Sequence, residues 1–95
     1  MTSSDRFERV DYEPEDAVTV RVFSRNGKTV AEVSWPPRVE HGRIVKPVIG
    51  NPHPVPDVLI QAIDLQRKHG FRRIVVMIDD ESLWRSEWGT LVHGA

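Results

Sequence analysis

The strongest constraint on the fold is the stretch AVTVRVFSRNGKTVAEVSW, residues 17–35, in which two alternating apolar and polar runs flank Asn26-Gly27. Asn-Gly is the dipeptide that a type I′ hairpin turn favours, because both central residues of that turn have positive φ. Taking this pair as the two-residue loop places Val20 opposite Val33. A slip of one residue would mix the apolar and polar faces, so the sequence predicts one register for this hairpin.

The segment after the hairpin is interrupted by prolines. Pro36-Pro37 ends the second strand, since proline cannot donate a hydrogen bond to a strand ladder. Residues 43–49 are a candidate third strand, which Pro47 restricts to a sheet edge or to an irregular segment. A stiff, extended connection then follows, with prolines at 52, 54 and 56.

An amphipathic helix is predicted to begin near Pro56, a residue suited to a first helical turn. Gly70 is predicted to end the helix in the left-handed conformation. Gln66 falls inside the apolar arc, so its amide must find a hydrogen-bond partner or reach water at the edge of the core. The apolar arc itself consists of Val58, Leu59, Ala62, Ile63 and Leu65.

The C-terminal part predicts a buried strand followed by a short helix. Residues 74–78, IVVMI, are apolar on both faces, which is typical of a central strand that joins its neighbour in parallel. Asp80 then suits the N-cap of a helix, with Glu81 and Arg85 as an i,i+4 ion pair. In such a helix the two tryptophans, Trp84 and Trp88, lie on one face.

These elements predict an α+β fold for a single small domain over residues 17–92, in the order β-β-(β)-α-β-α. One sheet would contain the hairpin and further strands, with one amphipathic helix and a short C-terminal helix. Residues 1–16 contain six acidic residues and two arginines. This composition predicts a flexible segment, although Val10 and Tyr12 could dock locally. Residues 93–95 are predicted to fray, and deletion of residues 1 to about 12 is predicted to be tolerated.

Composition narrows the classes of function. The chain has no cysteine, which excludes disulfides, a thiolate nucleophile and a cysteine zinc site. Its formal net charge of −1 disfavours nucleic acid as a partner. No apolar run approaches the length of a membrane span, so no membrane partner is expected and a cytoplasmic location is predicted.

The acids at the end of the last predicted strand allow two interpretations. His53, between two prolines, could act with Asp79 or Asp80 as a base or as a metal ligand, which would indicate a small enzyme or metal-dependent domain. The alternative, which we favour, is that the acids begin a helix whose tryptophans cover the edge of the core. No known catalytic motif and no resemblance to a known family is present, so no catalytic, cofactor or metal residue is assigned.

Two further features are candidate binding surfaces. The run RKHGFRR places Arg67, Lys68, Arg72 and Arg73 close together, which suggests a phosphate or nucleic-acid patch. The same charges also complement a helix C-terminus and begin a strand, and we favour that interpretation. The tryptophan pair at positions 84 and 88 is a candidate interaction surface. The leading hypothesis is therefore a non-enzymatic binding or accessory domain that acts through a protein partner or self-association.

Overall fold

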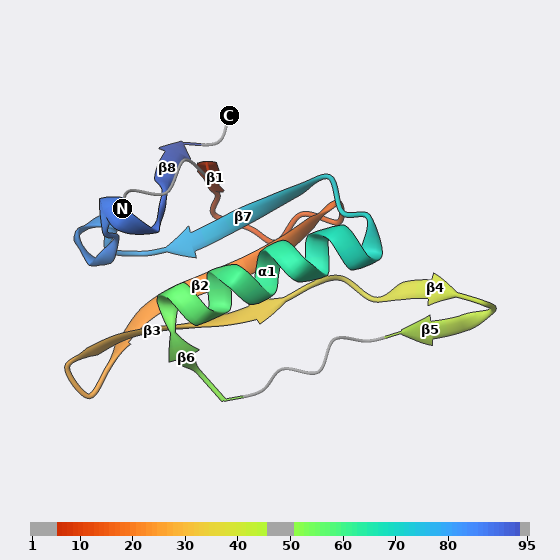
Figure 1. Ribbon diagram of the computed structural model, residues 1–95, viewed down its shortest axis with the longest axis horizontal. Helices are drawn as coiled ribbons and strands as arrows, with labels where there is room; N and C mark the ends of the chain where they lie inside the picture. The colour runs from red at the N-terminus through yellow and green to blue at the C-terminus, as the bar shows by residue number, and fades with distance from the viewer. Residues whose placement is uncertain (1–5, 46–50, 94–95) are drawn as a thin grey trace.

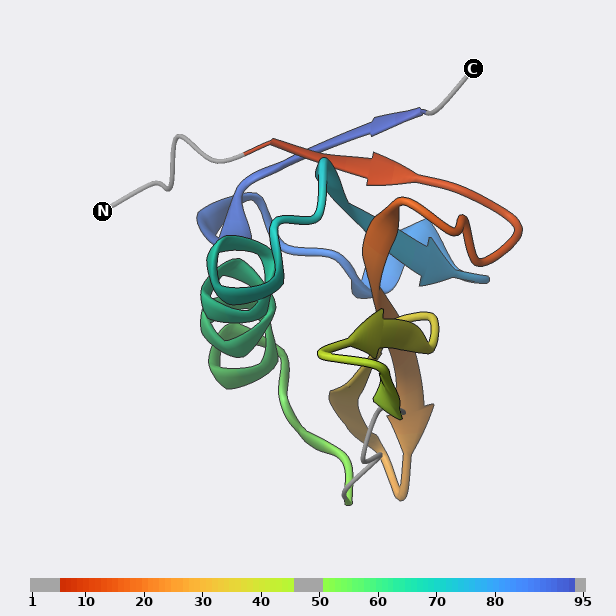
Figure 2. The ribbon, with the colours of Figure 1, turned by 90° about the vertical axis from the view of Figure 1, so that its right-hand side faces the viewer.

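The computed structural model describes residues 6–45 and 51–93 and shows one sheet with a helix packed on one side (Figures 1 and 2). The sheet has six strands in the order β6-β3-β2-β7-β1-β8, and a separate two-stranded sheet joins β4 to β5. The α+β class is confirmed. The elements are β1 (Arg6–Arg9), β2 (Ala17–Arg25), β3 (Lys28–Ser34), β4 (Arg38–Glu40), β5 (Arg43–Val45), β6 (His53–Pro54), α1 (Val55–His69), β7 (Arg73–Ile78), two 3₁₀ helices η1 (Glu81–Leu83) and η2 (Ser86–Trp88), and β8 (Thr90–His93).

The predicted hairpin and its register are confirmed. β2 and β3 are antiparallel, and Val20 pairs with Val33. Asn26 and Gly27 at the tip have φ of 53° and 76°, the positive values that a type I′ turn requires. Val20 is fully buried and Val33 nearly so, hence this face of the hairpin contributes to the main core.

Helix α1 covers the apolar face of the hairpin. Pro56 lies in its first turn, and Gly70 ends it with φ 70° and ψ 30°, as predicted. The amide of Phe71 donates to the carbonyl of Gln66, which completes the predicted C-terminal cap. Gln66 itself is half-buried at the edge of the core, where its amide can reach water. The buried residues of the helix are Val55, Val58, Leu59 and Ala62.

Strand β7 lies inside the sheet and runs parallel to both of its neighbours, β2 and β1. This confirms the interpretation of the apolar run at 74–78. Val76 belongs to the main core under α1, whereas Val75 packs on the other face with Val10 and Ala17. The strand is therefore apolar on both faces because both faces are covered.

The expectation of a flexible acidic segment is corrected for residues 6–16. Residues 6–9 form β1, which pairs in parallel with β7 on one side and β8 on the other. Phe7 is 2% exposed and belongs to the main core. The acids that suggested disorder meet arginines of the sheet, since Glu13 binds Arg21 at 2.7 Å and Asp16 binds Arg73 at 3.2 Å. Residues 1–5 and 94–95 lie outside the described residues.

The segment after β3 forms an arm. β4 and β5 pair antiparallel through a turn at His41 and Gly42, which have φ of 52° and 76°. In Figure 1 this arm extends beyond the end of α1, away from the six-stranded sheet. Residues 43–45 are thus a strand, but in a sheet of their own. The rest of the predicted third strand, residues 46–49, lies outside the described residues.

The predicted C-terminal helix is replaced by two separate 3₁₀ turns and a strand. Trp84 and Arg85 between the turns have extended backbones, with ψ near 137°. The predicted pair of Glu81 with Arg85 does not form, because Glu81 lies 3.5 Å from Arg9 and Arg85 lies 3.4 Å from Glu87. The physical reason is β1, which offers an edge to which residues 90–93 can pair as β8. Continuing a helix beyond Leu83 would carry the chain away from that edge.

Phe7→Ala tests whether β1 belongs to the core. We expect a loss of about 3–5 kcal/mol in the free energy of unfolding, because a fully buried aromatic ring is removed. Denaturant titration followed by tryptophan fluorescence measures this loss. Ile60→Ala is the matched control, since Ile60 is 68% exposed and its truncation should change stability by less than about 0.5 kcal/mol. Equal, small effects of both variants would show that β1 is dispensable.

Gly27→Val tests the hairpin turn. We expect a loss of about 1–2 kcal/mol, because the left-handed conformation is costly for residues other than glycine and most costly for β-branched ones. Asn26→Gly should leave the melting temperature almost unchanged, since glycine accepts the same φ. An unchanged melting temperature for Gly27→Val would contradict the turn type.

Candidate functional site

The acids after β7 cap a 3₁₀ turn. Asp80 is the N-cap of η1, and its Oδ1 accepts hydrogen bonds from the hydroxyl of Ser82 at 2.6 Å and from the backbone N–H of Ser82 at 3.0 Å. These two hydrogen bonds hold the pKa of Asp80 below its ordinary value. Capping by Asp80 is confirmed, although the element that it caps is one short turn.

His53 and the two aspartates after β7 are not neighbours. His53 pairs with Ala31 in β3. Ala31 pairs with Val22 in β2, and Val22 pairs with Ile78 at the end of β7. Three strand spacings of about 4.8 Å therefore separate the Cα atoms of His53 and Ile78 by roughly 14 Å. Among residues 6–45 and 51–93, no group of three or more His, Cys, Asp and Glu side chains could hold a metal ion.

The two tryptophans lie side by side over the main core. Their rings are 5.3 Å apart and nearly perpendicular, and Trp84 also packs edge-on against Phe7 at 5.8 Å. The indole Nε1 of Trp84 donates to the carbonyl of Gly89 at 3.1 Å. Both rings are half-buried, so each covers the core with one part and presents another part to solvent.

The tryptophans lead directly into strand β8, whose outer edge is unpaired among the described strands. This edge consists of Thr90, Leu91, Val92 and His93, without proline or a formally charged residue. Proteins usually block such edges with charges, prolines or very short strands. The other edge strand of the sheet, β6, follows that rule, because it has two residues and one of them is Pro54.

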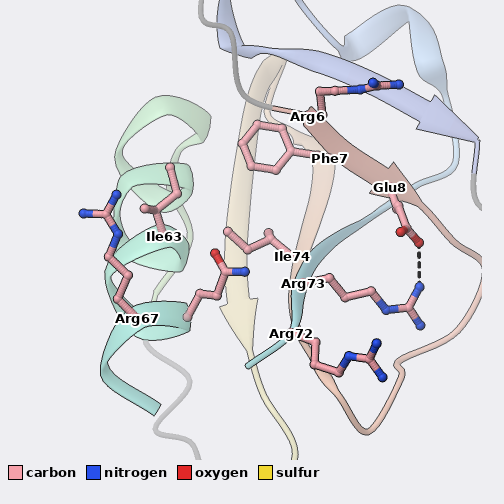
Figure 3. A pocket seen from close by; sticks show the side chains of 9 residues that line it. Arg6, Phe7, Glu8, Ile63, Arg67, Arg72, Arg73 and Ile74 are labelled. Atoms are coloured by element: carbon pink, nitrogen blue, oxygen red, sulfur yellow. Dashed lines mark hydrogen bonds and ion pairs between the residues drawn. The ribbon is translucent and has the colours of Figure 1, made fainter. Parts of the chain in front are cut away.

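Three of the four predicted basic residues line one hollow. Arg67, Arg72 and Arg73 line a volume of about 310 Å³ between the C-terminal half of α1 and the starts of β1 and β7 (Figure 3). Lys68 is exposed and lies outside it. Arg6 of β1 is a fourth arginine at this hollow. We call this site the arginine hollow; its lining residues are Arg6, Phe7, Glu8, Ile63, Gln66, Arg67, Arg72, Arg73 and Ile74.

The arginines of the hollow are not equivalent. Arg73 binds Glu8 at 2.5 Å and Asp16 at 3.2 Å. Burial acts to lower the pKa of Arg73, but its hydrogen bonds with Glu8, Tyr12 and Asp16 outweigh burial and raise it. Its charge is therefore already balanced by acids. The other three arginines form no ion pair with any described residue.

Sequence reasoning missed Arg6, because it placed this residue in a flexible segment. The only local signal was the pair of apolar residues, Phe7 and Val10, within a charged stretch. A strand of four residues carries too little periodicity to be distinguished from a loop.

Comparison with known proteins gives no relative: no family model, no curated protein and no solved structure matches the chain. In the part of the chain that the structure describes, no helix is long and apolar enough to cross a membrane.

Substitutions at Asp80 separate capping from metal binding. Asp80→Asn should retain most of the stability, since asparagine is nearly as good an N-cap, whereas Asp80→Ala should reduce it. Because folding lowers the pKa of Asp80, its stabilising effect should be present above the unfolded-state pKa and be lost as the pH falls through the folded-state pKa. Urea denaturation at pH 7 and at acid pH measures both effects.

The capping account also predicts that Mg²⁺, Mn²⁺ and Zn²⁺ leave the melting temperature unchanged. A saturable, stoichiometric stabilisation by one of these ions that disappears in Asp80→Asn would contradict it.

Proposed function

We propose that this chain is a non-enzymatic binding domain that acts through another protein chain, either a partner or a second copy of itself. The other chain adds a strand to the outer edge of β8. The observation that supports this proposal is the contrast between the two edge strands of the sheet: β6 has two residues, one of them a proline, whereas β8 has four residues and no proline. The cytoplasmic location stays a prediction from the sequence.

Strand addition suits β8 because backbone hydrogen bonds at a free edge supply affinity and alternate side chains supply specificity. Leu91 is level with Phe7 and therefore faces the same side of the sheet as α1. Thr90 and Val92 face the other side. The side chains of an added strand would thus contact Leu91 beside the tryptophans on one face of the sheet, and Thr90 and Val92 on the opposite face.

The tryptophan pair lies next to this edge and offers contact area. Leu83, Trp84, Trp88 and Leu91 are partly buried against the main core and keep some surface in contact with solvent. Aromatic residues of this kind are enriched among the residues that contribute most of the binding energy at interfaces. A chain paired with β8 could cover them without any change in the fold of this domain.

A second copy of this chain could supply the added strand through its own β8. A two-fold axis perpendicular to the sheet pairs two β8 strands antiparallel and keeps both helices on one side of the joined sheet. In the register centred on Leu91, this residue meets its own copy. Thr90 then meets the partner's Val92 on the opposite face. No like charges oppose each other within the paired strands, since β8 carries no formally charged residue.

Thr90→Lys tests the proposal by placing a charge on the free edge. Thr90 is exposed, so the substitution should leave the melting temperature within a few degrees of that of the wild type. Sedimentation equilibrium should show a dimer of the wild type that becomes a monomer in Thr90→Lys. If the wild type is a monomer, affinity capture from lysate treated with RNase should retain a protein that Thr90→Lys does not retain.

Ser24→Lys is the matched control. Ser24 is also an exposed strand residue, but it lies beside the hairpin tip, where it pairs with Thr29 of β3. The Ser24→Lys substitution adds the same charge as Thr90→Lys and should leave dimer formation and protein capture unchanged. The proposal is refuted if both variants behave like the wild type, or if the wild type neither self-associates nor captures a protein.

A further inference from the structure

We propose that the arginine hollow binds a small organic anion, in which a phosphate or carboxylate group is attached to an apolar body. This site is separate from the β8 edge and does not depend on strand addition there. Three properties of the hollow support the proposal: its charge, its apolar floor and its size.

The charge of the hollow is positive and largely unbalanced. Arg6, Arg67 and Arg72 have no ion pair with any described residue, whereas Arg73 is paired with Glu8. The C-terminus of α1 lies nearby and contributes about half a negative charge, which is small against three guanidinium groups. The three arginines line one hollow, and a charge within a Debye length of about 8–10 Å of a bound anion attracts it.

The floor of the hollow is apolar. Phe7 and Ile74 are buried core residues, and Ile63 of α1 is half-buried beside them. A bare inorganic ion would contact the arginines but would leave the exposed part of Ile63 facing water, since Phe7 and Ile74 are already buried. A ligand with an apolar body removes that surface from water as well, and burial of apolar area is favourable. The combination of cationic rim and apolar floor therefore selects an amphipathic anion.

The size of the hollow favours a small molecule over a polymer. Its volume of about 310 Å³ is at the lower end of the range of small-molecule sites, about 300–1,000 Å³. Nucleic acid is bound by longer basic tracks that neutralise several phosphates. The net charge of −1 also gives this chain no long-range attraction for a polyanion.

The arginine side chains are placed around the rim and do not yet converge. Figure 3 shows Arg67 extending outward from α1, and Arg6 and Arg72 extending away from the helix. All three are exposed and can turn toward a ligand. Ordering these side chains has an entropic cost, so we expect modest affinity that decreases as salt is added.

Phenyl phosphate is a suitable probe, because it joins the two chemical groups that the hollow selects. Binding is measured by ¹H–¹⁵N correlation spectra during titration of the full chain. We expect saturable shifts at residues 6–8, 63–67 and 72–74. Phenyl phosphate should bind at least about fivefold more tightly than inorganic phosphate or phenol, since each of these has only one of the two groups. Benzoate is titrated in parallel, and the tighter of the two organic anions identifies the preferred anionic group.

Arg6→Gln and Arg72→Gln should each weaken the binding of phenyl phosphate about threefold to tenfold, because each removes one charge-assisted hydrogen bond near solvent. Arg25→Gln makes the same charge change at the hairpin tip, at the opposite end of the sheet, and should bind as the wild type does. Thr90 pairs with Arg6, so Thr90→Lys adds a positive charge beside the hollow and should not weaken the binding of phenyl phosphate. Because the same variant should abolish strand addition at β8, failure at β8 and failure at the hollow are distinguishable.

The proposal is overturned if shifts scatter over the surface, or if Arg25→Gln weakens binding as much as Arg6→Gln and Arg72→Gln. It is also overturned if neither phenyl phosphate nor benzoate binds more tightly than inorganic phosphate and phenol.

Discussion

The pairing of β1 with β7 is the interaction on which half of the molecule depends. It places Phe7 in the main core and gives β8 a strand to join. Because β8 must begin beside Arg6, the chain after β7 turns back through two short 3₁₀ helices. This path packs Trp84 edge-on against Phe7. The tryptophan surface, the free edge and the arginine hollow are all consequences of one parallel strand pair.

Charge pairing explains how an acidic segment can lie on a sheet. The face opposite α1 presents Arg21 and Arg73, and the N-terminal segment supplies Glu8, Glu13 and Asp16 as their partners. Each pair is partly exposed and contributes little stability alone. Together they offset the repulsion among these three carboxylates. The apolar contacts of Phe7 and Val10 then hold the segment in place.

Local patterns predicted the parts of the fold that depend on neighbours in sequence. Asn26-Gly27 fixed the hairpin register, Gly70 marked the helix end, and Val75 and Val76 indicated a strand covered on both faces. Strands β1 and β8 could not be predicted in this way, since each has four residues and is stabilised by partners far along the chain. The hollow was predicted only in part for the same reason: Arg67 and Arg72 are close in sequence, whereas Arg6 reaches them only through β1.

The adjacency of the first and last strands constrains the order in which this chain can fold. Phe7 pairs with Leu91, so this ring finds its neighbour only after all the residues between the two have been made. Contacts of such sequence separation slow folding, because a long loop must close before they form. During synthesis the hairpin and α1 can assemble first, while Phe7 stays exposed. The growing chain therefore passes through a stage with an incomplete core, during which chaperones have the greatest opportunity to bind it.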